Sequence, residues 1–522
     1  MGQPNSICKA CSGPLTFRKP APSSPTPHLH RTIQAPDTSE AISLCQALGH
    51  ANSDLHDLVD DIAHVQTILD ELRQKREALH KFTIEHNAFL APIRRLPAEI
   101  LAEIFILCMP SYGLPNFDPN YSPLLVQNVC VGWRQLALST QTLWSSITVN
   151  PYRPSSKLAN LWISRAISAP LTIRLDSTSP SRLGPIQPAI GVLVQYCDRW
   201  KSLDLRIEET AVSRLNPIRH RLPWLESLRI QSPRESQLWC RSRELNFFEL
   251  APRLCNLSLG RGISHTSMKI PWHQLTELNA HVYVTECLEI LQLVPNLVKC
   301  TVYALMPSAI LSQDFPILTF PHLRFFSILR LLPPDEIFEH LKLPIIHALH
   351  IAYEKEGLDD SWLSPQPFMS LLSCSSRTLR RLEIDCLRSW EDSARIAHCL
   401  RATPLLTELC LRGRGSGSWL TTDLLHLLTR QPNVDVLVPD LEVLELSDQS
   451  IPCYDCMGMI ESRWWVAAGA HLKRVHIKMV RREDWLIDAE ILKRLLKCRQ
   501  EGMVISIGGV LNTHGRPAHV LH

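Results

Sequence analysis

A short apolar phrase recurs along most of the chain, and this recurrence constrains the fold more than any other feature of the sequence. The phrase has the form apolar-x-x-apolar-x-apolar, often with a proline two positions ahead, as in Leu406–Leu411 after Pro404. Alternation within the phrase predicts a short strand with one buried and one open face. The eleven occurrences, about 27 residues apart on average, begin at Trp200, Leu225, Leu254, Leu275, Leu297, Leu323, Ile346, Leu379, Leu406, Leu441 and Leu472.

The stretches between the phrases suit helices, as Leu288–Val294 and Leu424–Leu428 illustrate. A strand followed by a helix at this period resembles a leucine-rich-repeat solenoid. The steps are uneven, and the asparagine that many such repeats place after the strand is absent, so we expect an irregular array. We expect Leu171–Leu175 to add a first strand and Val504–Ile507 to close the far end.

The N-terminal region divides into a polar tail and a helix. Residues 12–36 are rich in proline and serine and cannot bury enough apolar surface to fold, so residues 1–40 are expected to be disordered. A helix is expected through most of 52–90, and it either packs on a neighbouring domain or forms a short coiled-coil dimer. Its apolar seam consists of Leu55, Leu58, Ile62, Val65, Leu69, Leu72 and Leu79.

Residues 93–147 combine two helical patterns. Pro97 suits the first turn of a helix and Glu99 suits the positive charge at its start, so a helix should begin at about Pro97 and end before Pro110. A second helix is expected over 124–136, with its apolar residues on one face, followed by the tryptophan of Thr142–Ile147. Gly132 should weaken this second helix by up to about 1 kcal/mol relative to alanine.

This segment resembles an F-box, the helical module that docks a chain onto the Skp adaptor of a cullin ubiquitin ligase. The resemblance rests on Leu96–Leu101, Val129–Ala137 and Thr142–Ile147. It implies that a set of mostly apolar residues faces the adaptor or supports the helices that do. These are Leu96, Pro97, Ile100, Leu101, Ile104, Val129, Trp133 and Trp144. The alternative is that they only fill the core of a small helical subdomain.

The open face of the predicted strands is the candidate site for a target protein, because strands line the concave wall of such solenoids. Charges of both signs alternate there, which suits a protein ligand better than a phosphate backbone. The predicted contact residues are Arg206, Arg229, His281, Lys299, Tyr303, His350, Arg381, Asp385, Arg412, Arg474 and Lys478. Asp204, Glu277, Asn279, Glu383, Glu408, Glu445 and His476 are expected to lie among them. Arg381, Arg412 and Arg474 could also bind a phosphorylated target.

Bulk composition argues against several function classes. The net charge is only +3 with both signs interspersed, so neither nucleic acid nor an acidic membrane is indicated as a partner. No stretch reaches the roughly 18 consecutive apolar residues of a membrane span, although Met1–Ser6 matches the short N-myristoylation pattern. The 17 cysteines are scattered, which predicts reduced thiols and a cytoplasmic or nuclear protein.

The sequence contains only incomplete versions of the motifs that mark metal binding, phosphate binding or catalysis. Cys8–Cys11 and Cys453–Cys456 each have the spacing of half a zinc site, but neither has a second pair nearby, so we expect no metal. Gly413–Gly417 lacks the lysine of a phosphate-binding loop and is expected to be an inter-repeat loop. No residue lies in a motif that marks a nucleophile, so we predict neither a catalytic residue nor a cofactor.

Together these patterns predict an α/β chain in which an N-terminal helix and an all-α F-box precede a leucine-rich-repeat solenoid. The predicted domains are 1–40 (tail), 41–91 (amphipathic helix), 92–150 (F-box), 151–510 (solenoid) and 511–522 (tail). This arrangement looks like that of fungal F-box proteins. It implies a non-catalytic subunit that brings an unknown protein substrate to a Skp–cullin ligase core. The alternative is a repeat scaffold or regulatory protein that uses no adaptor. Self-association through 52–90 is compatible with either function.

Overall fold

A computed structural model describes most of the chain, and it divides into two compact units, Met1–Leu101 and Ala102–His522. The described residues are 22–31, 33–109, 120–150, 156–177, 186–206, 212–232, 245–305, 315–331, 335–353, 365–387, 390–413, 418–431, 435–448, 450–465, 471–479 and 489–509. The predictions for Cys8–Cys11, Met1–Ser6 and 511–522 lie outside these residues.

The first unit is dominated by one long helix, α1 (Thr38–Leu90), which follows a 3-10 helix at Pro27–Arg31. It begins earlier than expected because Asp37 caps it. The Asp37 side chain accepts hydrogen bonds from the backbone N–H groups of Ser39 (2.8 Å) and Glu40 (2.7 Å), and Glu40 Oε2 accepts one from Asp37 N (3.0 Å). Part of the expected disordered tail is therefore helical.

The chain then forms short helices between residues 92 and 144. These are the 3-10 helix Pro92–Arg95, α2 (Ala98–Leu107), α3 (Leu124–Gln127), α4 (Val131–Ser139) and the 3-10 helix Gln141–Trp144. The prediction of one continuous helix over 124–136 was wrong. The backbone of Cys130 is extended (φ −160°, ψ 171°), and its Sγ accepts the Trp133 N–H at 3.5 Å as a cap that starts a separate helix.

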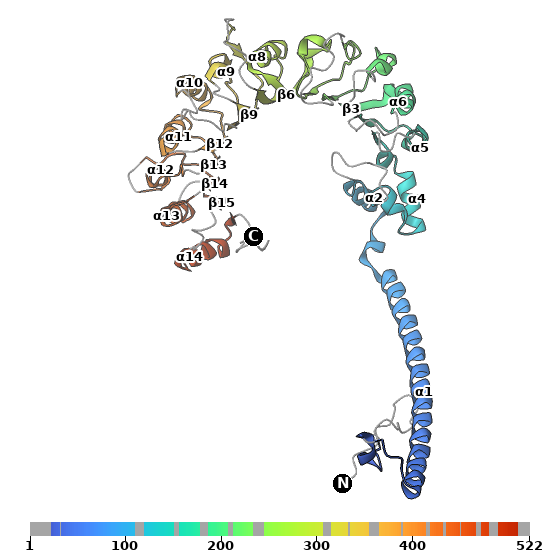
Figure 1. Cartoon of the computed structure of the whole chain (residues 1–522). Coiled ribbons are helices and arrows are strands. Elements are labelled where there is room, and N and C mark those ends of the chain that lie inside the picture. Colours follow the sequence, from blue (N-terminus) through green and yellow to red (C-terminus); the bar gives the residue numbers. More distant parts are fainter. Residues whose placement is uncertain are drawn as a thin grey trace. The chain divides into compact units, whose positions relative to one another are not determined.

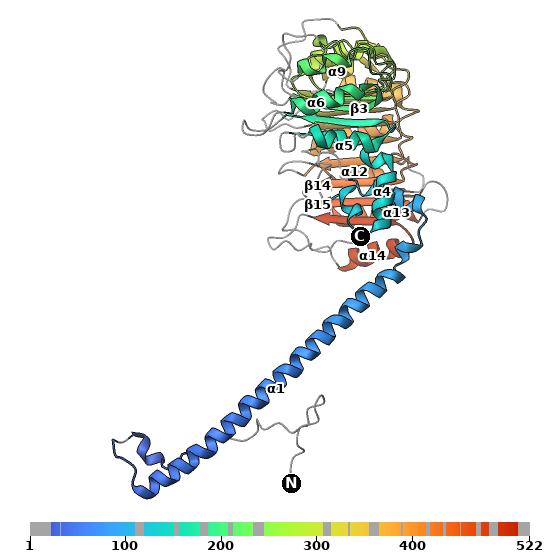
Figure 2. The ribbon, with the colours of Figure 1, turned by 90° about the vertical axis from the view of Figure 1, so that its right-hand side faces the viewer.

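The rest of the second unit is built on a 14-stranded parallel sheet in which successive strands lie side by side, as Figure 2 shows for β14 and β15. Its strands are β1 (Ser146–Val149), β2 (Leu171–Asp176), β3 (Trp200–Arg206), β4 (Ser227–Ile230), β5 (Asn256–Leu259), β6 (Glu277–Tyr283), β7 (Lys299–Leu305), β9 (Phe325–Leu331), β11 (Ala348–Tyr353), β12 (Arg381–Leu387), β13 (Glu408–Gly413), β14 (Val443–Asp448), β15 (Arg474–Met479) and β16 (Val504–Gly509). A separate pair joins β8 (Leu318–Thr319) to β10 (Leu341–Lys342).

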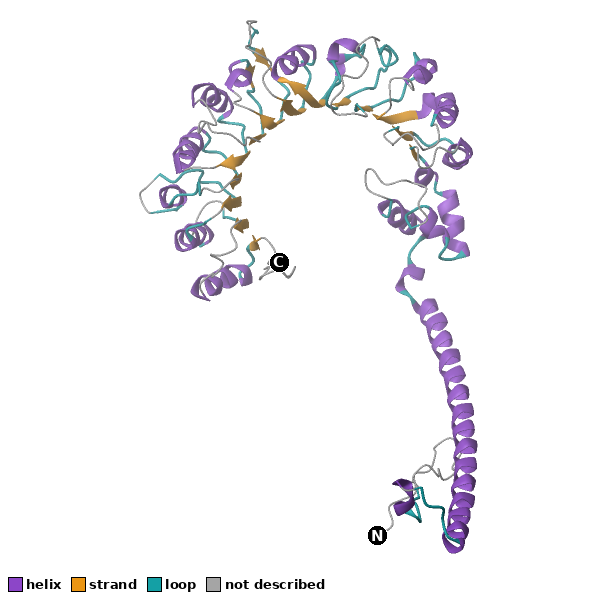
Figure 3. Ribbon diagram, in the orientation of Figure 1, coloured by secondary structure: helices purple, strands orange, loops and turns teal. Residues whose placement is uncertain are grey.

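Helices cover one face of this sheet. Within the second unit the strands follow the inner side of an arc and the helices its outer side (Figures 1 and 3). The helices are α5 (Ser156–Ala166), α6 (Gln187–Leu193), α8 (Val284–Leu293), α9 (Asp335–Glu339), α10 (Pro365–Ser375), α11 (Trp390–Ala402), α12 (Thr422–Leu428), α13 (Cys453–Trp464) and α14 (Ala489–Gln500). Shorter 3-10 helices occupy Val194–Arg199, Ser213–Ile218, His265–Ser267 and Trp272–Gln274.

The core lies between the sheet and the helices, and the register of the strands aligns it. One residue from every strand of the large sheet contributes to a continuous buried apolar row, and each member pairs with the next across the ladder. The row is Ile147, Ile173, Leu203, Leu228, Leu257, Leu278, Cys300, Phe326, Leu349, Leu382, Leu409, Leu444, Val475 and Ile505. Each strand therefore buries its apolar side between its neighbouring strands and the helical layer.

The coarse expectation of a mixed α/β chain with a long sheet and an N-terminal helix is confirmed. Each of the eleven phrases contains a strand, and strands also lie at Leu171–Asp176 and Val504–Gly509. Residues 146–149, expected to end the helical segment, instead form β1 and pair with β2. Among the described residues, no helix combines the length and apolar content that crossing a bilayer requires.

Candidate functional site

The face of the large sheet that points away from the helices carries a continuous row of polar side chains. Its members sit between the buried positions of each strand and pair with one another in register. We call this set the polar row; it comprises Thr148, Arg174, Asp204, Arg229, Ser258, Asn279, Thr301, Ser327, His350, Glu383, Cys410, Glu445, His476 and Ser506.

The predicted contact residues all lie on strands, with half-buried or exposed side chains. The structure brings some of them together and separates others. Arg206 and Arg229 lie on β3 and β4, and Arg474 and Lys478 lie on β15. His281 and Tyr303 pair in register on β6 and β7 with their rings stacked 4.0 Å apart, and Lys299 begins β7.

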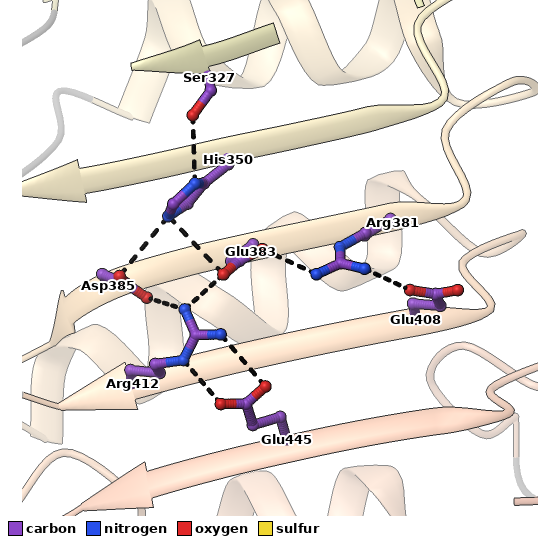
Figure 4. A network of polar contacts seen from close by, with 8 residues as sticks. All are labelled: Ser327, His350, Arg381, Glu383, Asp385, Glu408, Arg412 and Glu445. Carbon is purple, nitrogen blue, oxygen red and sulfur yellow. Dashed lines mark hydrogen bonds and ion pairs between the residues drawn. The ribbon is translucent and has the colours of Figure 1, made fainter. Parts of the chain in front are cut away.

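The densest polar contacts join strands β9 to β14 and are drawn in Figure 4. Four predicted residues meet there with three acids and one serine. We call this set the β9–β14 network: Ser327, His350, Arg381, Glu383, Asp385, Glu408, Arg412 and Glu445. Ser327 was missed, although its position between buried Phe326 and Ile328 already indicated that its side chain faces outward.

Arg412 is the centre of the network. Its guanidinium makes two parallel hydrogen bonds to the Glu445 carboxylate, from Nε to Oε1 (2.8 Å) and from Nη2 to Oε2 (3.1 Å). Its Nη1 donates to Asp385 Oδ1 (2.9 Å) and to the Glu383 carboxylate. This fork geometry is the strong form of an arginine–carboxylate contact. Three strands, β12, β13 and β14, are thereby linked through one side chain.

Arg381 forms the second ion pair of the network. Its Nη2 donates to Glu383 Oε2 at 3.1 Å and its Nη1 to Glu408 Oε2 at 2.9 Å. Arg381 and Glu408 are register partners on β12 and β13. Arg381 and Arg412, two of the three arginines considered for phosphate binding, therefore already donate to carboxylates. A phosphate would have to displace those carboxylates, which weakens the prediction of phosphate recognition at these two residues.

His350 joins the network from β11. Its Nδ1 lies 3.1 Å from Ser327 Oγ, and its Nε2 lies 3.5 Å from Asp385 Oδ2 and 3.8 Å from Glu383 Oε1. The last two distances are too long for strong hydrogen bonds. The imidazole thus sits beside two carboxylates whose strong bonds go to Arg412.

The guanidinium of Arg412 controls the ionisation of its neighbours. Burial acts to raise the pKa of Asp385, but contacts with His350 and the charge of Arg412 outweigh burial and lower it. The Arg412 hydrogen bonds likewise hold the pKa of Glu445 below its usual value, against burial. Burial acts to lower the pKa of Arg412 itself, but Glu445 and Glu383 reverse this and raise it. All three groups are therefore charged at neutral pH.

Two guanidinium groups face four carboxylates in the network, so it carries two negative charges when His350 is neutral. Within the described residues, His350, Glu383 and Asp385 are the one group whose ligand atoms lie close enough to hold a metal ion together. The donor set fits a divalent cation poorly, because the Arg412 guanidinium already binds both carboxylates and would repel the ion. The network therefore fits an ion-pair cluster better than a metal centre.

Burial keeps two thiols, Cys410 and Cys456, protonated and therefore weakly nucleophilic. Cys410 lies in the polar row between Glu383 and Glu445, and burial together with these two carboxylates raises its pKa to about 12. Cys456, from the second Cys-x-x-Cys motif, is buried in α13, which raises its pKa to about 12. Both thiols are therefore protonated at neutral pH.

The residues predicted to contact an adaptor differ in accessibility. Leu96, Pro97, Ile100 and Val129 are exposed, whereas Ile104 and Trp133 are half-buried and Leu101 and Trp144 are buried. Trp144 is 0% exposed, and its Nε1 donates to the Ala137 carbonyl at 2.8 Å. Its ring also packs edge-on against Trp162 of α5 (centroids 5.0 Å apart). Trp144 therefore supports the fold and touches no surface ligand.

Other exposed apolar residues in the second unit were not predicted. Leu107, Leu125 and Val131 are 82%, 47% and 67% exposed. Leu107 and Leu125 belong to the apolar stripes of the two expected helices, but a stripe alone does not say which of its members another helix covers. Trp133 is partly covered because its ring packs 4.8 Å from that of Phe105.

No protein-family model matches the chain, and a search of curated proteins found no match.

Proposed function

We propose that this chain is the substrate receptor of a Skp–cullin–F-box ubiquitin ligase. In this proposal residues 92–150 are an F-box that binds the Skp-type adaptor. The parallel array is an irregular leucine-rich-repeat solenoid whose polar row binds a protein target. The ligase core would then transfer ubiquitin to a target held nearby, so the chain contributes proximity and not chemistry. Its place of action would be the cytoplasm or the nucleus.

The observation that carries the proposal is the exposure of apolar side chains by the short helices. Leu96 and Ile100 are 37% and 50% exposed, and Val129 is 57% exposed, at positions where the F-box resemblance expects adaptor contacts. A small helical segment that leaves large aliphatic residues in water is typical of a partner-binding surface. The polar row supports the second half of the proposal, since it offers charges of both signs to a protein ligand.

Exposure also decides which variants test the proposal. Leu101 and Trp144 are buried, so changing them would unfold the segment and would not report on binding. Ile100→Asp and Val129→Asp place a charge on exposed positions and leave the core intact. Leu161→Asp is the matched control, because Leu161 is 40% exposed on α5, outside the segment.

The experiment is co-purification of the full chain with a recombinant Skp-type adaptor. We expect the parent and Leu161→Asp to retain the adaptor, and Ile100→Asp and Val129→Asp to lose at least tenfold in affinity while keeping the parent's circular dichroism spectrum. A folded parent that does not bind the adaptor would overturn the proposal and leave the repeat scaffold as the better account. Equal loss in the Leu161→Asp control would show that the effect is not specific to the segment.

A further inference from the structure

The middle of the open sheet face is apolar, in contrast to its two ends. The strands β6, β7, β9 and β11 are the sixth to ninth of the fourteen in the order of the sheet. Each carries residues that lie next to a buried residue of the same strand and therefore point to the open face. We call six of them the central patch: His281, Tyr303, Phe325, Leu329, Ala348 and Ala352. Phe325 is 48% exposed and the other five are half-buried.

The central patch is continuous across the strands. Tyr303 pairs in register with His281 on one side and with Leu329 on the other, and the His281 and Tyr303 rings stack with 4° between their planes. Among the open-face side chains of these four strands that the structure describes, only Glu277 and Lys299 carry a fixed charge at neutral pH. These two are register partners of opposite sign. The patch thus presents aromatic and aliphatic surface with no net charge.

A carboxylate of the β9–β14 network borders the central patch. Asp385 pairs in register with Ala352, a member of the patch. Its Oδ1 accepts from Arg412 Nη1 at 2.9 Å, whereas its Oδ2 lies 3.5 Å from the His350 imidazole, too far for a strong hydrogen bond (Figure 4). The half-buried Asp385 can therefore accept a further hydrogen bond from a cation while it stays paired with Arg412.

We propose that the central patch holds a large apolar side chain of the target protein while Asp385 binds a lysine or arginine of the same target. This inference rests on the second half of the proposed function, the binding of a target by the open face. An apolar centre within a charged rim is the usual anatomy of a protein interface, and the strongest contacts lie near that centre. Charge complementarity selects the occupant, because the network beside the patch carries two negative charges and would repel an acidic segment.

The order of the strands sets the spacing between the two groups of the target. Three strand steps separate β7, which carries Tyr303, from β12, which carries Asp385. At about 4.8 Å per step this is about 14 Å. An extended segment rises about 3.4 Å per residue, so its basic residue should lie about four positions from its apolar anchor. The target segment would therefore cross the strands in an extended form.

The first test pans a phage-displayed library of random peptides on the immobilised full chain. We expect the enriched peptides to combine an aromatic or large aliphatic residue with a lysine or arginine about four residues away. The variant Tyr303→Ser with Phe325→Ser should lose these peptides. Its control is Leu250→Ser with Tyr454→Ser, which removes exposed apolar side chains outside the strands and should keep them. A folded parent that enriches no peptide, or only peptides without this pattern, would overturn the inference.

The second test compares an enriched lysine peptide with its norleucine analogue by fluorescence anisotropy. The parent should bind the lysine peptide about tenfold more tightly, whereas Asp385→Asn should bind the two alike. Asp423→Asn removes an equal charge from the exposed side of α12 and should keep the tenfold difference. If Asp385→Asn weakens both peptides and keeps their ratio, Asp385 only supports the fold and the inference is wrong.

Two further measurements separate this inference from its rivals. If sedimentation velocity shows a parent that self-associates and a Tyr303→Ser with Phe325→Ser variant that does not, a second copy of the chain covers the patch and the inference fails. The same variant should retain the Skp-type adaptor, and Ile100→Asp should retain the enriched peptides, so that each proposal can fail without the other. Loss of the peptides by Ile100→Asp would place them on the helical segment and overturn the inference.

Discussion

Arg412→Met should destabilise the middle of the array and leave its ends largely unaffected. Arg412 bonds Glu383, Asp385 and Glu445 at once, so its removal leaves three carboxylates close together on β12 and β14 without a counter-charge. Methionine keeps most of the aliphatic volume of the side chain, so the effect should reflect the lost charge. In a parallel array each strand depends on its neighbours, so the damage should be local.

The magnitude follows from burial. Breaking a fully buried ion pair by removing one partner costs about 3–5 kcal/mol. Arg412 is 30% exposed and Glu445 is 26% exposed, so water screens part of the interaction. We therefore expect a loss of about 2 kcal/mol of local stability at pH 7, which corresponds to an increase of about 30-fold in the hydrogen exchange rate of the β12–β14 amides.

The pH dependence tests the cause. Arg412 lowers the pKa values of Asp385 and Glu445 below those of the unfolded chain. Such depressed groups stabilise the fold fully above their unfolded pKa values of about 4, and this stabilisation is lost as the pH falls through the folded values. The difference between parent and Arg412→Met should therefore be full at pH 7 and shrink below about pH 4.

The assay is hydrogen exchange by mass spectrometry, supported by urea unfolding at pH 7 and pH 3. The control is Lys473→Met, which removes a contact of 2.8 Å to Glu442 in which the lysine is 64% exposed. It should cost under about 1 kcal/mol. An Arg412→Met variant with parental exchange in β12–β14, or with the same loss at both pH values, would refute the reasoning.

Three further substitutions test the packing, each measured as the change in the free energy of unfolding. Gly132→Ala should stabilise α4 by up to about 1 kcal/mol, since an added Cβ meets no atom within 4 Å. Gly413→Ala should destabilise the fold by about 1–3 kcal/mol, because the new Cβ would lie 2.6 Å from Trp419 Cδ1. Its control is Gly458→Ala, which should not destabilise the fold because the new Cβ would meet no atom within 4 Å. Arg463→Leu should cost about 3 kcal/mol or more, because the buried guanidinium donates to three backbone carbonyls.

Each of these expectations can fail in a specific way. A destabilised Gly132→Ala would mean that α4 needs the glycine backbone. Equal effects of Gly413→Ala and Gly458→Ala would mean that the Trp419 ring can shift to make room for the new Cβ without lowering the stability of the fold. A neutral Arg463→Leu would mean that water or a neighbouring donor satisfies the three carbonyls.

The positions of the strands could be predicted from sequence because burial repeats every second residue within each phrase. Leu444 and Leu446, for example, are buried and flank the half-buried Glu445. The strand β1 was not predicted, because its four residues overlap and follow the tryptophan-containing segment Thr142–Ile147, which was assigned to the helical region. The helix α1 begins at Thr38, three residues before the predicted boundary at residue 41, because the capping box of Asp37 and Glu40 lies next to a proline-rich stretch.

The polar contacts were harder to predict than the face that carries them. The phrases show that Arg381, Glu408 and Arg412 point away from the core, but they do not say which carboxylate meets which guanidinium. That depends on the register between strands, and the uneven steps between phrases hide it. Once the ladder aligns Arg381 with Glu408 and Asp385 with Arg412, the ion pairs follow, and the arginines prove to be engaged with carboxylates.

The net charge of the sheet face that carries the polar row changes along the sheet. This change would determine in which direction a target protein could lie along that face. At β2–β4 three arginines, Arg174, Arg206 and Arg229, lie with two aspartates, and burial raises the pKa of Asp204 despite Arg174 and Arg229. This end is therefore positive, whereas the β9–β14 network carries two negative charges. Charge complementarity guides orientation more than affinity. A target lying along the strands' open face would therefore place its basic groups on β11–β14 and its acidic groups on β2–β4, and a target with the reverse order would be rejected.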